Sequence, residues 1–301
     1  MIQYKDIELS DKKIFDKYFS LKEFENSGFT FTSLYVWRHH YSSRFAIVDD
    51  YLCMIGRYRN RFPILIPPIG NEEDGNFANV FLKTIEDFQK RGYSVIIKSI
   101  TESTKETIEK YLPGLLYYKP DPDNYDYVYL SRDLIELRGR KFHKKRNHIN
   151  TFLKKYDYTY EPIDGNNIEQ CIKMELEWFN ARGRKKGLEE EKAAIIEALN
   201  NFDELQLTGG ALRIDDDIQA FSIGELLNPN MAVIRFEKGN TEYDGIYAMM
   251  NQQFAKNAFS HVKYINREED MGIPGLRRAK RSYNPIKMVT KYTGYLKGSS
   301  Y

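Results

Sequence analysis

Residues 264–283 bring acids, bases and turn residues together in one short stretch. They read Tyr264-Ile265-Asn266-Arg267-Glu268-Glu269-Asp270-Met271-Gly272-Ile273-Pro274-Gly275-Leu276-Arg277-Arg278-Ala279-Lys280-Arg281-Ser282-Tyr283. A short apolar run leads into three successive carboxylates, then into a Gly-Ile-Pro-Gly turn and a strongly basic helix. Charged groups of both signs at a strand end and a helix start are typical of a functional site. We therefore expect the site of this protein in this stretch.

The elements predicted around this stretch follow one order twice. The first half predicts helices at 11–19 and 31–41, strands at 44–48, 51–57 and 62–66, a helix at 76–91, a strand at 93–97, a helix at 103–111 and a strand at 125–130. The second half predicts helices at 167–181 and 189–201, strands at 205–214, 218–227 and 231–237, a helix at 243–259, a strand at 262–265, a helix at 275–282 and a strand at 286–292. This repetition indicates duplication and predicts two α+β domains, residues 1–135 and 136–301, each with a mixed, mostly antiparallel sheet flanked by helices.

The composition narrows the class of protein. The chain has 301 residues, of which 42% are hydrophobic and 14% aromatic, enough for two folded cores. Its 45 basic and 43 acidic residues leave a net charge of only +2. Two distant cysteines predict neither a disulfide framework nor a zinc site. No apolar run reaches the ~20 residues of a membrane span and no signal peptide is evident, so we expect a cytoplasmic protein.

Residues 137–156 are locally basic, with eight Lys or Arg residues and no acid. An apolar stripe of Phe142, Ile149, Phe152 and Tyr156 predicts an amphipathic helix here. We expect RNA phosphates to be bound by four of its cations, Lys141, Lys144, Lys145 and Arg146. The alternative is an ordinary solvated helix face, above all at Lys154 and Lys155.

Four segments resemble a known family: residues 141–150, Gly209-Gly210-Ala211-Leu212, Ala220-Phe221-Ser222-Ile223-Gly224-Glu225, and residues 264–283. They are similar to an uncharacterised bacterial family that resembles the C-terminal catalytic domain of phosphatidylglycerol lysyltransferase. The order of elements resembles the GNAT acyltransferase fold, and its repetition resembles the tandem-GNAT aminoacyltransferases. The resemblance implies transfer of an aminoacyl or acyl group to an amine or hydroxyl. It also implies aminoacyl-tRNA as donor and, with no membrane portion expected, a small-molecule, peptide or lipid-headgroup acceptor.

Coenzyme A is the alternative donor, and no tightly bound cofactor is expected. GNAT domains hold the pyrophosphate of coenzyme A in a glycine-containing loop, but residues 237–245 do not fit that pattern. Glu242 and Asp244 would face the phosphates there, and like charges at ~4 Å cost about 4 kcal/mol at an effective dielectric near 20. The loop is better suited to a cation, such as the α-ammonium of an aminoacyl group. A third possibility is a non-catalytic binding protein on the GNAT scaffold.

The predicted catalytic residues all lie in the stretch 264–283. Glu268 or Asp270 would deprotonate or orient the nucleophile, Asn266 would position the donor carbonyl, and Lys280 would offset charge on its oxygen. The alternative is structural: Asp270 caps the following helix, Glu268 pairs with Arg277 or Arg278, and Asn266 closes a turn.

Five further residues are predicted to bind substrate: Glu237, Tyr243, Tyr247, Arg277 and Tyr283. Glu237 ends a predicted strand where a GNAT strand meets its substrate, and Tyr243 would also help to position the donor carbonyl. A surface ion pair for Glu237 and simple packing for the tyrosines are the alternatives. His143 and His148 lie about 140° apart around a helix, so no metal site is expected.

Overall fold

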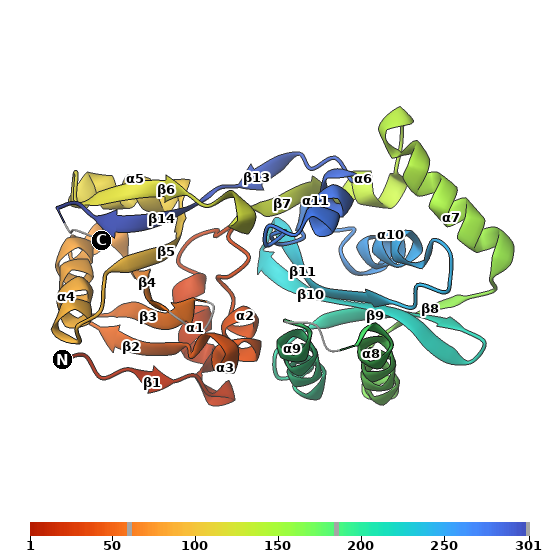
Figure 1. Cartoon of the computed structure of the whole chain (residues 1–301), viewed down its shortest axis with the longest axis horizontal. Coiled ribbons are helices and arrows are strands. Elements are labelled where there is room, and N and C mark those ends of the chain that lie inside the picture. Colours follow the sequence, from red (N-terminus) through yellow and green to blue (C-terminus); the bar gives the residue numbers. More distant parts are fainter. Residues whose placement is uncertain (59–61, 184–186, 299–301) are drawn as a thin grey trace. The chain divides into compact units, whose positions relative to one another are not determined.

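The computed structural model describes residues 1–58, 62–183 and 187–298 (Figure 1). Its contacts divide the chain into two compact units, Met1–Tyr125 with Val289–Tyr301, and Asp126–Met288. Each unit is built on a mixed sheet of seven strands that carries helices. The predicted α+β class with two tandem GNAT-like modules is confirmed.

The sheet of the first unit has the order β1 (Lys5–Asp6), β2 (Arg44–Val48), β3 (Tyr51–Tyr58), β4 (Phe62–Ile69), β5 (Ile96–Thr101), β14 (Lys291–Leu296), β6 (Leu116–Pro120). β4 and β5 are parallel because α4 (Phe77–Lys90) carries the chain back between them. Asp49 and Asp50 both have positive φ, which is the conformation of a tight hairpin turn, and they join β2 to β3.

The helices of the first unit cover its sheet. They are α1 (Lys12–Phe19), α2 (Phe31–Val36), α3 (Arg38–Tyr41), α4 and α5 (Glu102–Tyr111), with single turns at Leu9–Asp11, Glu72–Asp74 and Pro122–Asn124. The apolar side of α4 is buried against the sheet, where Phe81 and Phe88 pack with Leu65 and Ile97. Burial of each such side chain contributes about 1.5–3 kcal/mol.

The sheet of the second unit has the order β13 (Lys287–Val289), β7 (Asp126–Leu130), β12 (Tyr264–Asn266), β11 (Met231–Gly239), β10 (Asp217–Asn228), β9 (Thr208–Ile214), β8 (Thr159–Pro162). β11 and β12 are parallel and are joined by α10 (Ile246–Ala258). Read from β8, this order repeats that of the first sheet, which supports the predicted duplication.

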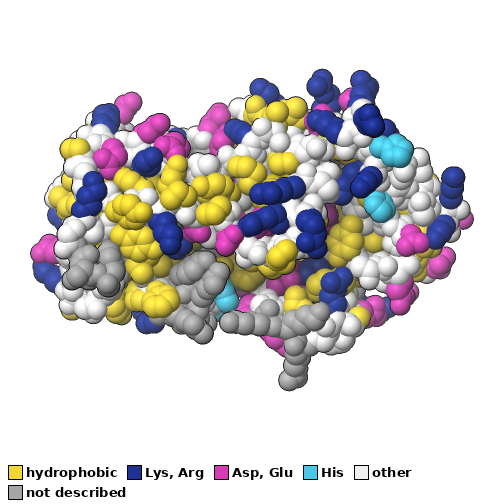
Figure 2. Space-filling view, turned by 45° about the horizontal axis from the view of Figure 1, so that its top comes forward, with side chains coloured by type: hydrophobic (Ala, Val, Ile, Leu, Met, Phe, Trp, Pro, Cys, Tyr) yellow, Lys and Arg dark blue, Asp and Glu magenta, His cyan; other side chains and the backbone are white. Residues whose placement is uncertain are grey.

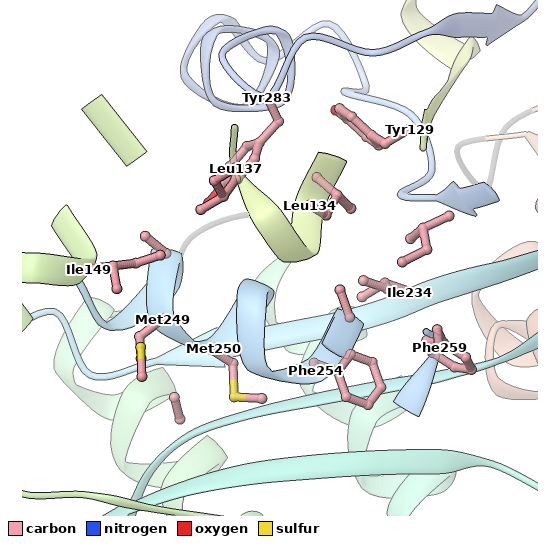
Figure 3. Packing of buried hydrophobic residues seen from close by; sticks show 14 of the residues in the cluster. Tyr129, Leu134, Leu137, Ile149, Ile234, Met249, Met250, Phe254, Phe259 and Tyr283 are labelled. Atoms are coloured by element: carbon pink, nitrogen blue, oxygen red, sulfur yellow. The ribbon is translucent and has the colours of Figure 1, made fainter. Parts of the chain in front are cut away.

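Helices cover both faces of the second sheet (Figure 1). α6 (Ser131–Glu136), α7 (His143–Lys155) and α10 lie on one face, and α8 (Ile168–Arg182) and α9 (Leu188–Asn200) lie on the other. The single turn Arg140–Phe142 precedes α7, and α11 (Pro274–Arg281) follows β12. Met249, Met250 and Phe254 of α10 point toward the sheet in the apolar core (Figure 3).

The structure differs from the prediction in how the strands are divided between the two sheets. Residues 286–292 are not one strand, because β13 lies in one sheet and β14 in the other. β7, expected to end the first module, pairs with β12 of the second. The units therefore do not meet at the expected boundary 135/136. Alternation of side chains predicts that a segment is extended but not which strand it pairs with.

Smaller differences concern the ends of strands. β4 continues through Pro67 and Pro68 to Ile69, β5 begins at Ile96 rather than at residue 93, and β6 and β8 were not predicted. β6 and β8 end their sheets, and such short edge strands carry little apolar alternation.

The N-terminus of α10 is covered by the backbone of α7. Gly245, the residue that precedes α10, has φ +88°, and a β-carbon placed on it would overlap the carbonyl oxygen of His148. Glycine is therefore required at this position for two reasons, its left-handed backbone and the contact with α7.

Gly245→Ala tests this contact against Gly187→Ala. Both glycines precede a helix with φ near +90°, but a β-carbon at Gly187 meets no atom of the described residues within 4 Å. Gly187→Ala should cost about 1–2 kcal/mol from backbone strain alone. Gly245→Ala should cost about 1–3 kcal/mol more because of the overlap. Urea unfolding followed by circular dichroism measures both, and equal losses would mean that α7 does not press on α10.

Candidate functional site

The candidate site lies where β11 and β12 stop pairing. The two strands are paired over only three residues, from Met231 opposite Tyr264 to Val233 opposite Asn266. Beyond this point β11 continues to Gly239, while the other segment leaves the sheet with Arg267. Arg267 Nη2 donates a hydrogen bond of 3.0 Å to Glu237 Oε1 across the parting strands. Both side chains are largely buried.

The carboxylate of Glu237 is also held from the sheet and from α10. Asn251 Nδ2 donates to Glu237 Oε2 at 3.2 Å, and Ser222 Oγ donates to the same oxygen at 3.4 Å. Ser222 stands directly opposite Glu237 on β10, and both Ser222 and Asn251 are fully buried. The orientation of this carboxylate is therefore fixed from three sides.

Two cations share the ring of Tyr283 beside this carboxylate. The ammonium of Lys145 lies 3.8 Å from the ring centroid, and the guanidinium carbon of Arg267 lies 4.9 Å from it. Burial lowers the pKa of Lys145 to about 8, and Arg267 lowers it further while Glu237 opposes the shift. We name these residues the Glu237 cluster: Ser222, Glu237, Asn251, Arg267, Lys145 and Tyr283. With Lys145 protonated, one carboxylate faces two cations, so the cluster carries a net charge of +1.

A β-bulge lies directly before Glu237. Ile223 stands opposite Phe236 and Gly224 stands opposite Ile234, so β11 has one extra residue, Arg235, at this point. The buried Arg235 donates to Glu225 at 2.8 Å and to Glu268 at 2.6 Å. Burial raises the pKa of Glu268 to about 7, although Arg235 opposes the shift. Glu268, predicted as a base, thus titrates near neutrality but is held by a buried arginine.

Asp270, the other predicted base, is fully engaged within its own loop. Arg277 donates to both of its oxygens at 2.8 Å, Tyr127 donates at 2.6 Å and the amide of Gly272 at 2.9 Å. Arg277 is the main cause that lowers the pKa of Asp270 to about 2. A carboxylate with this pKa is a weak base at neutral pH. We therefore assign Asp270 and Arg277 to the support of the loop, in place of the expected roles.

Lys280 and Asn266 also support the loop. The ammonium of Lys280 donates to the carbonyl oxygens of Arg267 and Glu269, and burial lowers its pKa to about 8. Asn266 Oδ1 accepts from the amide of Glu268 at 2.7 Å, and its Nδ2 donates to Asp126 at 3.2 Å. The turn-closing alternative describes Asn266 better than contact with a donor carbonyl. Both side chains hold the backbone on either side of Arg267.

The predicted substrate residues divide into two groups. Glu237 and Tyr283 both contact Arg267 in the cluster, and Tyr247 of α10 packs against the apolar core of the same unit. Tyr243 instead packs edge-on against Tyr156, with 5.0 Å between ring centroids. Asp244 beside it pairs with Lys155 at 2.6 Å, so the cation expected at this loop is supplied by the chain itself.

The four predicted RNA-binding residues differ in their surroundings. Lys141 pairs with Asp133 at 2.8 Å, and Arg146 donates to the carbonyl oxygens of Leu137 and Gly139. Lys145 turns inward to the cluster, whereas Lys144 is exposed. Figure 2 shows Lys and Arg side chains together on the part of the surface where α7 lies.

Arg267, Asn251 and Ser222 were not predicted as site residues, and Lys145 was predicted to bind RNA. Ser222 is a single polar residue inside an apolar run, and Asn251 lies at helical spacing from the apolar residues Phe254 and Ala255. These are the signals that could have found them. A lone polar residue in a core element needs a buried partner, which here is Glu237.

The comparisons with known proteins identify the family of this chain. The family model described as "Phosphatidylglycerol lysyltransferase, C-terminal" matches residues 19–295. The chain belongs to this family. In the part of the chain that the structure describes, no helix combines the length and the apolar character that a membrane span needs.

Several solved structures also resemble this chain. A conserved protein of unknown function from Bacteroides thetaiotaomicron is 37% identical, with a TM-score of 0.91 over 99% of this chain and 100% of that one. The C-terminal domain of a putative lysylphosphatidylglycerol synthetase from Agrobacterium fabrum is 14% identical, with a TM-score of 0.66 over 97% and 93%.

Two further proteins are similar to this chain over different lengths. A tandem GNAT protein from the clavulanic acid biosynthesis pathway is 6% identical, with a TM-score of 0.50 over all of both chains, and it shares the fold alone. An uncharacterized protein of Mycoplasmoides gallisepticum is 28% identical over 174 residues, which are 56% of this chain and 54% of that protein. The alignment thus spans about half the length of this curated relative.

Asp270→Asn tests the loop support through its pH dependence. The pKa of Asp270 is lower in the folded protein, about 2, than the ~3.9 of an unfolded chain, so its ion pair stabilises the fold above pH ~4. Asp270→Asn should lose about 2 kcal/mol of unfolding free energy at pH 7. This difference from wild type should shrink as the pH falls from 4 toward 2. Glu242→Gln, at an exposed acid of the same unit, is the control, and a loss independent of pH would contradict the assignment.

Proposed function

We propose that this protein transfers an aminoacyl group from aminoacyl-tRNA to an amine or hydroxyl acceptor. The observation that most supports this function is the net positive charge of the Glu237 cluster, which lies where β11 and β12 stop pairing. The nucleophile attacks the ester carbonyl, the new C–N or C–O bond forms, and an electron pair moves onto the carbonyl oxygen. The ester C–O bond then breaks, and the terminal ribose oxygen of the tRNA leaves with the proton that the nucleophile lost.

The cluster offers a group for each charge that develops. Arg267 and protonated Lys145 would stabilise the carbonyl oxygen as it becomes negative, in a site where burial strengthens their field. Glu237, the acid between them, would accept the proton of the attacking amine or hydroxyl. Tyr283 holds both cations against its ring and limits their movement.

The surroundings of α10 favour an RNA donor over coenzyme A. A GNAT domain binds pyrophosphate at the N-terminus of the helix that follows its fourth strand, which corresponds to α10 here. That N-terminus is covered by the carbonyl of His148, and its adjacent acid, Asp244, pairs with Lys155. Phosphate groups would meet carbonyl and carboxylate oxygens there instead of free amides.

Helix α7 links the proposed RNA surface to the cluster. Lys144 and Lys154 are exposed on α7, while Lys145 of the same helix points to Tyr283. Phosphates bound along the exposed side of α7 would bring the 3′ end of a tRNA toward Lys145. The donor class implied by the lysyltransferase family supports the same arrangement.

Lys145→Met tests the proposed chemistry. In the presence of amine, peptide or lipid acceptors, the wild-type protein should release the amino acid from a pool of charged tRNA. The rate of this release should fall as the pH rises through about 8, where Lys145 loses its proton. Lys145→Met should be slower by about a hundredfold and should lose this dependence. Lys256→Met, at an exposed lysine of the same unit outside α7, should retain wild-type rates. Release of free thiol from acyl-coenzyme A without any use of charged tRNA would instead establish the coenzyme A alternative.

Lys144→Glu/Lys154→Glu tests RNA binding by α7. Each lost phosphate contact lowers the slope of log affinity against log salt by about 0.7–0.9, so the double variant should lose roughly 1.5 units. Gel shifts with bulk tRNA at several salt concentrations measure this slope. Lys256→Glu/Lys263→Glu changes the same charge on the same unit outside α7 and serves as the control. Equal slopes for the two double variants would exclude α7 as the RNA surface.

A further inference from the structure

Two buried polar atoms of the Glu237 cluster form no hydrogen bond with any described residue. They are Arg267 Nη1, a donor, and Asn251 Oδ1, an acceptor. Nearly all buried polar groups in folded proteins have partners, and leaving one unmet costs about 1–3 kcal/mol. Both atoms belong to side chains that already hold Glu237 through their other nitrogens. Two unmet groups of opposite kind beside one carboxylate indicate that a ligand completes them.

The contacts of Glu237 decide which kind of group each atom offers. Asn251 must direct its NH2 group to the Glu237 carboxylate, because the reversed amide would place two oxygens together. The other atom of this amide group, Oδ1, is therefore a hydrogen-bond acceptor. Arg267 offers Nη1, which can only donate. The ligand must then supply a hydrogen-bond donor to Asn251 and an acceptor to Arg267.

An α-aminoacyl group has these two functions on adjacent carbons. We propose that the Glu237 cluster binds the free α-ammonium of the donor aminoacyl group at Asn251 Oδ1 and the Glu237 carboxylate, and its carbonyl oxygen at Arg267 Nη1. This inference rests on the proposed aminoacyl transfer and adds to it a requirement for an unblocked α-amino group. N-Acylated aminoacyl groups would lose the charge and one or more of these donors.

Binding of small probes to the wild-type chain tests this without any reaction. Calorimetric titration would use L-amino-acid amides with apolar, acidic and basic side chains, because each has the α-ammonium and the carbonyl. The N-acetyl derivative of each amide that binds should bind at least tenfold more weakly, since a charge-assisted hydrogen bond is lost. A simple primary amine without the carbonyl, such as ethylamine, should also bind at least tenfold more weakly. Equal binding of amides and their N-acetyl derivatives would overturn the proposal, as would no binding of any amide.

Two variants locate the binding on the cluster. Asn251→Ala and Arg267→Lys should each weaken binding of the best amide by about tenfold or more. Asn257→Ala, an exposed asparagine on the same helix, should bind like wild type. Thermal unfolding of each variant shows whether it is folded. If Asn251→Ala does not fold, Arg267→Lys and the comparison with N-acetyl amides still decide whether the cluster binds the amide. Unchanged binding by a folded Arg267→Lys variant would overturn the assignment of the carbonyl oxygen to Arg267.

Transfer assays separate this inference from the proposed function. Aminoacyl-tRNA and its N-acetylated form would be compared as donors for the same acceptor. If both are used at equal rates, aminoacyl transfer stands and the α-ammonium subsite is wrong. If amides bind as expected but no charged tRNA is consumed, the subsite stands and the proposed transferase activity is wrong.

Discussion

The early end of pairing between β11 and β12 is the constraint on which the candidate site depends. Parallel strands that separate within one sheet expose backbone and side chains that would otherwise be covered. In this protein the separation is bridged by the ion pair between Arg267 and Glu237, 3.0 Å long and largely buried. A buried ion pair is stable only when further hydrogen bonds satisfy both partners. Asn251 and Ser222 supply them to Glu237.

Around this pair lies a second layer that fixes the backbone. Lys280 binds the carbonyls of Arg267 and Glu269, Asn266 binds the amide of Glu268, and Asp270 anchors the helix that follows. These contacts are internal to residues 264–283, so the stretch acts as a preformed frame for one side chain, Arg267, which reaches Glu237 on β11. Preorganised donors are most effective where charge develops during a reaction, because they do not need to reorient.

The sequence predicted the fold class well, but not the contacts that the residues of the candidate site make. The duplicated order of elements and the basic helix at α7 follow from periodicity and local charge. The sequence cannot distinguish an acid that supports a loop, such as Asp270, from one that faces a substrate, because both occur beside cations. It also cannot pair Ser222, Glu237 and Asn251, which lie on three elements and meet only in the folded sheet.

The place of β14 makes the first sheet depend on a segment far along the chain. Six of its strands, β1 to β6, come from one continuous run, and β14 (Lys291–Leu296) joins them only after the second unit has been passed. β14 separates β5 from β6 and pairs with both of them. During synthesis, β5 and β6 therefore stay unjoined until residues 291–296 have left the ribosome. Loss of β14 would thus impair the unit whose other strands were translated first.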